Sequence, residues 1–262
     1  MSAKLILMSL LKNWSQVLKR VDHPSPNFSD KLIPVEYVVI HYTACSLERT
    51  LEIFSDREKK VCAHFVLAEN GDLYDLGNFY YGPIRQGAHA GETSFNVGGK
   101  TLRVFNEFSI GIEIVNLNGN VFPFRDAQYE SLKELMLHLK NLFPTLNDPD
   151  RIVGHEQIAG HRGKADPGRC FDWARFYQSI YRARKFPVRE PKCSKEHAAF
   201  LAELIQNTNP ADRDDPNFWP RISAELEARV AEGSEHHDLG ANARPGIFTH
   251  ALANPQSTAD HD

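Results

Sequence analysis

The sequence predicts an α/β domain over residues 23–185, in which helices pack on a β-sheet, followed by a small helical C-terminal extension. Two observations predict this fold class. Segments with the period-2 alternation of strands are interspersed with segments that carry apolar residues at helical spacing. The chain has 262 residues, of which 42% are apolar, and this length accommodates a domain of about 150–200 residues with an appendage.

The first half of the domain contains three predicted elements. Residues 35–40 are rich in β-branched side chains and predict a strand. Apolar residues at helical spacing predict a short helix over residues 47–54. Asn70-Gly71 lies between two short apolar runs and predicts a hairpin. Residues 77–105 show no period, so we expect a long irregular connection of the kind that often forms a binding loop.

The second half continues the alternation of strands and helices. Residues 108–115 predict a strand with isoleucines on one face and Glu113 on the other. A helix with an apolar stripe follows, with Asp126 expected as its N-cap. Residues 151–154 predict a short strand and residues 155–171 a polar loop. Asp172 is expected to cap the last helix of the domain.

The segments outside the domain are predicted from composition. Residues 1–22 begin with a short apolar run that lacks a small-x-small cleavage site, so we expect an amphipathic helix over residues 1–20, with an export signal as the alternative. Residues 186–232 are expected to form a helical extension with two helices over residues 195–232, docked near the helix that begins at Trp173, with a dimer contact or a wall of the substrate groove as the alternative. Residues 233–262 are polar and are expected to be disordered.

Charge and cysteine content exclude several classes of protein. The net charge of −4 argues against nucleic acid as a partner, because such proteins present a strongly basic face. No apolar run is long enough for a transmembrane segment. The four cysteines are scattered and form no CxxC pair, so we expect buried free thiols, which favours a reducing compartment. They are Cys45, Cys62, Cys170 and Cys193.

Three residues form a candidate metal site: His41 and His155, which each end a predicted strand, and Asp166. Taken alone, a histidine at the end of an apolar strand is more often a hydrogen-bonded structural residue than a ligand. Two histidines and one carboxylate are nevertheless the ligand count of a catalytic zinc site, which keeps a fourth position open for water. The sequence permits these residues to meet in space but does not require it.

Two charged residues are candidates for catalysis, and each has a simpler interpretation. Glu113 is either a solvated residue on the outer face of its strand or a pocket residue able to act as general base. Lys164 is a solvated cation by default, but beside a metal-bound substrate it would stabilise an oxyanion. Because Pro167 favours an extended backbone at Asp166, Lys164 and Asp166 are expected to project to the same side.

Seven short segments occur in the order found in a known family. The chain resembles the zinc-dependent N-acetylmuramoyl-L-alanine amidases of type 2, which include anhydromuropeptide amidases, phage T7 lysozyme and the peptidoglycan recognition proteins. The segments are Val38–Thr43, Ala63–Phe65, Gly87–Gly91, Phe108–Glu113, Val153–Glu156, Lys164–Gly168 and Phe171–Phe176.

The resemblance implies a fold, a cofactor and a reaction. The implied fold is a mixed, five- or six-stranded sheet with helices on both faces, and Zn²⁺ in a groove at one edge. His41, His155 and Asp166 match the family's zinc ligands. The implied reaction is hydrolysis of the amide bond between N-acetylmuramic or anhydromuramic acid and L-alanine, in intact sacculi or in soluble peptidoglycan fragments (muropeptides).

The resemblance also assigns roles to other residues. Glu113 matches the family's acid/base residue and Lys164 its oxyanion-stabilising residue. Four residues in or near the matching segments are candidates for substrate binding. They are His64, His89, Asn106 and Arg162.

The chain departs from the family pattern at three places. Ala63 stands where the phage and animal members carry a tyrosine, which places the chain with the bacterial branch that relies on the glutamate. Residues 160–163 contain one residue more than the family's usual spacing, so the loop is expected to bulge. Residues 186–262 match no family segment.

Other interpretations remain open at this point. His155 and His161 superficially suggest a metalloprotease helix, but that motif needs the second histidine four residues on, and here it lies six on. The second class of function is a peptidoglycan-binding module without catalysis, which we disfavour because all three ligands are present together with Glu113 and Lys164. A secreted lysin or effector would share the chemistry.

The sequence constrains the cellular location and the preferred substrate less than the reaction. We expect a cytoplasmic enzyme of muropeptide recycling, with a periplasmic or secreted protein as the alternative. The preference between anhydro-fragments and intact sacculus, and the oligomeric state, stay open.

Overall fold

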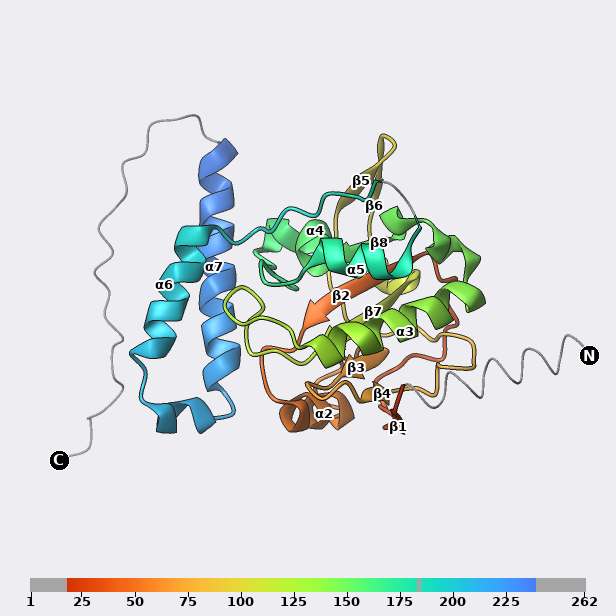
Figure 1. Cartoon of the computed structure of the whole chain (residues 1–262), viewed down its shortest axis with the longest axis horizontal. Helices are drawn as coiled ribbons and strands as arrows, with labels where there is room; N and C mark the ends of the chain where they lie inside the picture. Colours follow the sequence, from red (N-terminus) through yellow and green to blue (C-terminus); the bar gives the residue numbers. More distant parts are fainter. Residues whose placement is uncertain (1–17, 183–184, 239–262) are drawn as a thin grey trace, which may run out of the picture.

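The computed structural model describes residues 18–182 and 185–238. Its centre is a six-stranded mixed sheet with the strand order β1–β4–β3–β7–β2–β8 (Figure 1). The strands are β1 (Arg20–Asp22), β2 (Tyr37–Tyr42), β3 (Phe65–Leu67), β4 (Leu73–Asp75), β7 (Ser109–Ile114) and β8 (Ile152–Gly154). A separate hairpin consists of β5 (Phe95–Val97) and β6 (Lys100–Leu102).

Four neighbouring strands of this sheet, β3, β7, β2 and β8, run parallel to one another. In the register of β2 with its neighbours, His41 pairs with Glu113 of β7, and Ile40 pairs with Gly154 of β8. The carboxyl ends of β7, β2 and β8 therefore meet at one edge of the sheet, where ligand sites of parallel sheets form.

Helices cover both faces of the sheet, as the resemblance implied. On one face, α3 (Asp126–Leu142) and α5 (Trp173–Ile180) share an apolar core with alternate residues of β2 and β7, such as Ile40 and Ile112. On the other face, Val39 and Val153 pack against α4 (His155–Ala159) and the 3-10 turn at Phe105–Glu107. The helix α2 (Leu47–Ser55) joins the first core through Phe54.

Several elements differ from the sequence prediction. Arg20–Asp22 form a strand that pairs with β4, so the sheet begins before residue 23, and the rest of the expected N-terminal helix, up to residue 17, lies outside the described residues. The predicted loop 155–171 opens with α4, since the backbone N–H of Gly154 donates to the side chain of Gln157 at the helix start. The N-cap of α3 is Arg125 rather than Asp126.

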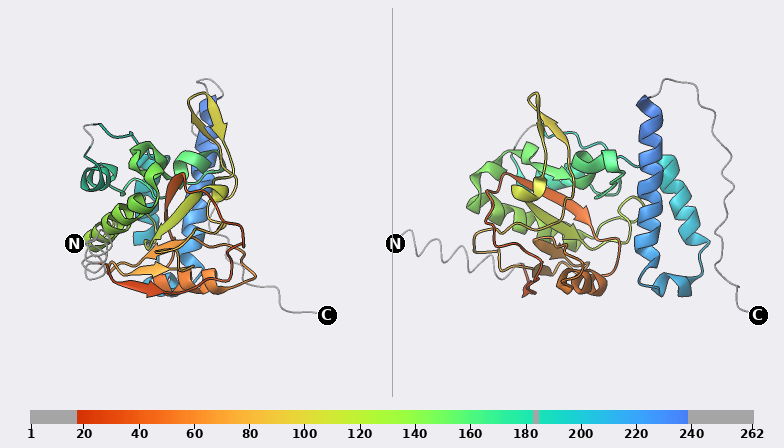
Figure 2. Two further views of the ribbon diagram at one scale, coloured as in Figure 1. Left: turned by 90° about the vertical axis from the view of Figure 1, so that its right-hand side faces the viewer. Right: turned by 180° about the vertical axis from the view of Figure 1, so that it is seen from behind.

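The C-terminal extension consists of α6 (Lys195–Gln206), a 3-10 turn at Pro210–Asp214 and α7 (Phe218–Asp238). Both helices lie side by side next to the domain, on the side toward which β2 points (Figures 1 and 2). The helix α7 continues five residues beyond Gly233, where we expected disorder, because a single glycine costs a helix only about 1 kcal/mol. Residues 239–262 lie outside the described residues.

The extension docks on the domain, but not at the predicted place. Its apolar residues form one cluster with Ala165, and Val121 and Phe122 pack against that cluster. The contact is thus with the loops at the carboxyl edge of the sheet rather than with α5. The connecting segment is tied to the domain by hydrogen bonds, among them Arg189 Nη2 to the carbonyl of Ile152 at 2.8 Å and the backbone N–H of Lys192 to Glu156 Oε2 at 2.8 Å.

Candidate metal centre

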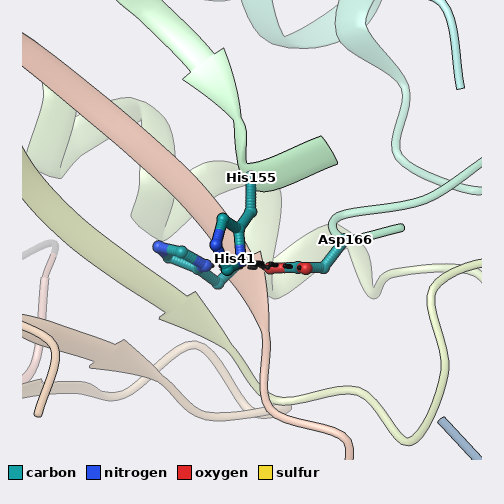
Figure 3. Close-up of side chains that lie close together, drawn as sticks. All are labelled: His41, His155 and Asp166. Atoms are coloured by element: carbon teal, nitrogen blue, oxygen red, sulfur yellow. Dashed lines mark hydrogen bonds and ion pairs between the residues drawn. The ribbon is translucent and has the colours of Figure 1, made fainter. Parts of the chain in front are cut away.

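The three predicted metal ligands meet at the carboxyl edge of the sheet (Figure 3). His41 is the fifth residue of β2, and His155 follows β8 as the first residue of α4. Asp166 comes from the loop after α4. All three side chains are buried, and one potential ligand atom from each lies within 4.8 Å of the others.

The hydrogen bonds of His155 determine which of its nitrogens faces the centre. Nε2 lies 3.0 Å from the carbonyl oxygen of Ala90, which only accepts, so Nε2 carries the proton. Nδ1 then presents a lone pair to both carboxylate oxygens of Asp166, at 3.1 Å each. The hydrogen bond from Nε2 to the Ala90 carbonyl is of the outer-shell kind that orients metal-ligating histidines.

A chain of hydrogen bonds sets the tautomer of His41 in the same way. His89 Nε2 faces the carbonyl oxygen of Ser109 at 3.3 Å and therefore donates to it. Its Nδ1 is then the acceptor for His41 Nε2, at 3.1 Å. Burial, followed by the charge of His155, lowers the pKa of His41 to about 4, so His41 is neutral and its Nδ1 lone pair faces Asp166 Oδ2 at 2.8 Å.

This geometry fits a metal cation. Two imidazole lone pairs and a carboxylate converge, and neither histidine has a proton on the converging side when it is neutral. Three acceptors in a buried site repel one another unless a positive charge lies between them.

The loop that carries Asp166 is fixed by backbone contacts. The backbone N–H of Glu156 donates to the carbonyl of Asp166 at 2.8 Å. Asn120 Nδ2 donates to the carbonyl of Ala165 at 3.0 Å, and its Oδ1 accepts from the backbone N–H of Arg169 at 3.1 Å. Asn120 therefore holds the loop on both sides of the ligand, a role that the sequence analysis missed although the run Asn116–Asn120 is rich in asparagine.

Glu113 lies beside this centre on the neighbouring strand. Its register partner is His41, and the side chains of the pair point to the same face of the sheet because the strands are parallel and in register. Its Oε2 is buried without a hydrogen-bond partner. Burial, and to a lesser degree the charge of Asp166, raises the pKa of Glu113 well above its ordinary value, while Lys164 opposes this shift. Of the two interpretations left open, the structure favours a pocket residue.

Lys164 lies in the same loop as Asp166. Its positive charge acts on the candidate metal centre, since it contributes to lowering the pKa values of His41 and Glu113. The expected bulge before it is a 3-10 turn at Gly160–Arg162, which ends at Gly163 with φ +82°. The side chain of Lys164 forms an ion pair with Glu227 of α7, at 2.8 Å.

The four substrate-binding candidates have different surroundings. His64 Nδ1 accepts from the backbone N–H of Gly111 and its Nε2 donates to the carbonyl of Arg85, both at 2.9 Å, so both nitrogens serve the fold. His89 orients His41, as described above. Asn106 Oδ1 accepts from the backbone N–H groups of His89 and Ala90 and so fixes that loop.

Arg162 is the one of these four candidates that is exposed as a residue. Its Nη2 donates to the carbonyl of Ala90 at 3.0 Å, the same carbonyl that accepts from His155. His161 is also exposed and lines a polar hollow of about 420 Å³ beside α4. None of the three metal ligands lines this hollow.

Comparison with known proteins identifies the family. Residues 31–169, just over half of the chain, match the family described as N-acetylmuramoyl-L-alanine amidase. The chain belongs to this family. The matched region contains both histidines, Asp166 and Glu113, together with five of the six strands of the sheet.

Individual relatives share the same region. The chain is 38% identical over 123 residues to the 1,6-anhydro-N-acetylmuramyl-L-alanine amidase AmpD of Haemophilus influenzae, a match that covers 47% of this chain and 60% of that protein. It is 33% identical over 118 residues to AmpD of Escherichia coli, covering 45% of this chain and 57% of that protein. The chain thus spans less than two thirds of the length of these relatives.

The fold also matches a solved structure. A crystal structure of a selenomethionine derivative of AmpD superposes with a TM-score of 0.50 at 26% identity and covers 62% of this chain and 94% of that chain. The predicted fold class, a mixed sheet with helices on both faces, is therefore confirmed. Within residues 18–182 and 185–238, no helix is long and apolar enough to cross a membrane.

Proposed function

We propose that this protein is a zinc-dependent amidase that hydrolyses the bond between the lactyl group of N-acetylmuramic or anhydromuramic acid and L-alanine in peptidoglycan fragments. The observation that carries this proposal is the convergence of three proton-free ligand atoms, from His41, His155 and Asp166, beside a buried carboxylate with an unpartnered oxygen. Membership of the amidase family and the AmpD relatives support the choice of bond.

The ligand chemistry favours zinc over hard cations. Two imidazole nitrogens and one carboxylate are the usual donor set of catalytic zinc, whereas magnesium and calcium prefer oxygen ligands only. Zinc in such a site polarises the carbonyl under attack and lowers the pKa of water to about 7. His89 and the carbonyl of Ala90 hold the two imidazoles in the ligating orientation.

Glu113 is the proposed proton carrier. Its unpartnered Oε2 would take a proton from the attacking water and deliver it to the nitrogen of the leaving alanine. The direction of its pKa shift suits this role, because burial favours the protonated carboxyl and a general acid must carry a proton. Lys164 would stabilise the negative charge that develops on the carbonyl oxygen.

Digestion of two substrates in parallel tests the proposal. Purified protein is incubated with anhydromuropeptides and with intact sacculi, with and without a zinc chelator, and the products are identified by mass spectrometry. We expect release of free stem peptide, loss of activity on chelation, and recovery on addition of zinc. Intact substrates in the presence of zinc-loaded protein would contradict the proposal and would favour a peptidoglycan-binding module.

The same experiment addresses the cellular role. The proposal extends to muropeptide recycling in the cytoplasm, because the relatives are named for 1,6-anhydro substrates. A clear preference for anhydromuropeptides over sacculi would support it. Equal or better digestion of sacculi would favour a periplasmic or secreted enzyme.

A further inference from the structure

The helix α7 makes a close backbone contact with the loop that carries Lys164 and Asp166. A Cβ atom on Gly163 would lie only 2.2 Å from the carbonyl oxygen of Glu227, so any side chain at this position would displace the helix. Two residues further on, Ala165 is fully buried in the apolar cluster that α6 and α7 form. The extension is therefore in direct contact with the catalytic loop on both sides of Lys164.

The contact includes the side chain of Lys164 itself. Its Nζ donates to Glu227 Oε2 at 2.8 Å, and the two side chains are only 30% and 25% exposed. A lysine side chain has four rotatable bonds, so fixing it costs side-chain entropy. In this structure the carboxylate of Glu227 supplies the contact that fixes the ammonium group.

Glu227 also lies within electrostatic reach of the metal ligands. Burial is the largest cause that raises the pKa of Glu227, Lys164 is the largest that opposes it, and the charge of Asp166 adds to the rise. Glu227, Lys164 and the metal ligands thus form one connected set of charges, in which Lys164 stands between a carboxylate from α7 and the centre.

From these contacts we infer that Glu227 is a positioning residue for Lys164 and that α7 is a structural part of the catalytic centre. This inference rests on the proposed function, in which Lys164 stabilises the oxyanion. By holding Nζ, Glu227 keeps the ammonium group of Lys164 near the carbonyl oxygen on which negative charge develops. Less side-chain freedom of Lys164 is then lost when the transition state forms.

Kinetics of two single variants test the inference. Glu227→Gln keeps the size of the side chain and removes its charge. We expect kcat to fall about 10- to 100-fold, the range for residues that orient catalytic groups from outside, with KM changing less than kcat and with zinc content and melting temperature near those of the wild type. Glu225→Gln is the matched control, because Glu225 lies on the same helix and pairs with Arg229 at 2.8 Å, away from Lys164. Its kcat should be unchanged.

A double variant separates positioning from a general structural role. In a Lys164→Met background, Glu227→Gln should cause no further loss of kcat, because Glu227 is expected to act only through Lys164. A full additional loss in that background would overturn the inference. A higher kcat in Glu227→Gln alone would also overturn it, since Glu227 would then be a latch that draws Lys164 away from the substrate.

Chemical labelling tests the contact without relying on activity. Trace acetylation of Lys164 with acetic anhydride, measured by mass spectrometry, should be faster in Glu227→Gln than in the wild type and unchanged in Glu225→Gln. Equal rates in all three proteins would overturn the inference. If the wild type hydrolyses neither muropeptides nor sacculi, the proposed function fails, and the labelling rates still decide whether Glu227 holds Lys164.

Discussion

His41 and His64 are equally buried histidines with different roles. His41 is 2% exposed and His64 is 0% exposed. Burial is the main cause that lowers the pKa of each imidazole to about 4. Both nitrogens of His64 are satisfied by backbone groups of the protein. His41 is satisfied on Nε2 only, and its Nδ1 lone pair faces the carboxylate of Asp166.

The comparison shows which property marks a functional histidine in this fold. Burial and a lowered pKa do not distinguish the two, because both follow from removing an imidazole from water. The distinguishing property is a lone pair without a donor, aimed at another acceptor. In His64 the backbone N–H of Gly111 fills that position, so no cation is required there.

The largest expected loss of activity comes from removing one of the three metal ligands, of which His41 is one. His41→Ala, His155→Ala and Asp166→Ala should each abolish turnover and lower bound zinc, because a three-ligand site has no spare ligand. Elemental analysis of the purified variants and turnover of anhydromuropeptide measure both effects. One full equivalent of zinc in His155→Ala would show that the ligand assignment is wrong.

The next largest effect separates chemistry from metal binding. Glu113→Gln should retain zinc and lose about 10²- to 10⁴-fold in turnover, the range for a general acid/base. Parallel zinc analysis and single-substrate kinetics measure it. Near-normal turnover would assign the proton transfer to another residue, such as His161 or His89.

A smaller effect tests the hydrogen-bond chain behind His41. His89→Leu removes the acceptor for His41 Nε2 and should weaken zinc binding about 10- to 100-fold, because outer-shell partners tune metal affinity by that amount. Competition with a chelator of known affinity measures this change. His89→Gln keeps an acceptor and is the control; equal zinc affinity in all three proteins would refute the proposed tautomer of His41.

Substitution of His64 should leave zinc binding almost unchanged. His64→Leu removes the partners of the Gly111 N–H and the Arg85 carbonyl, and each unpaired buried group costs about 1–3 kcal/mol. We therefore expect a lower free energy of unfolding in urea, with zinc still bound at one equivalent. A variant that loses its zinc while keeping its stability would assign His64 to the metal centre.

The pH dependence of stability sharpens this last test. The pKa of His64 is lowered from 6.5 to about 4 on folding, so the unfolded state takes up the proton first. The resulting stability is complete above pH 6.5 and is lost as the pH falls toward 4, and this one group accounts for about 3 kcal/mol. In urea titrations over this range, His64→Leu should show a shallower dependence than the wild type. Identical slopes would mean that the pKa of His64 does not change on folding.

Much of the fold followed from local patterns. The Asn70-Gly71 hairpin between β3 and β4, the helix from Trp173 and the alternation around Glu113 were all predicted, since each depends on residues within one or two turns of chain. The short helix α4 was missed because five residues are too few to show a helical period. The family resemblance supplied the ligand set, which no local pattern could select.

Local patterns in the sequence predicted that His41 and His155 lie at the ends of strands and that Glu113 lies on the strand face opposite the isoleucines. Which atoms meet depends on how the elements pack. Packing brings the two Nδ1 atoms to Asp166, satisfies both nitrogens of His64, and pairs Lys164 with Glu227. The physical reason is that periodicity reports the face that is buried, whereas a partner 63 residues away along the chain depends on how separate elements pack.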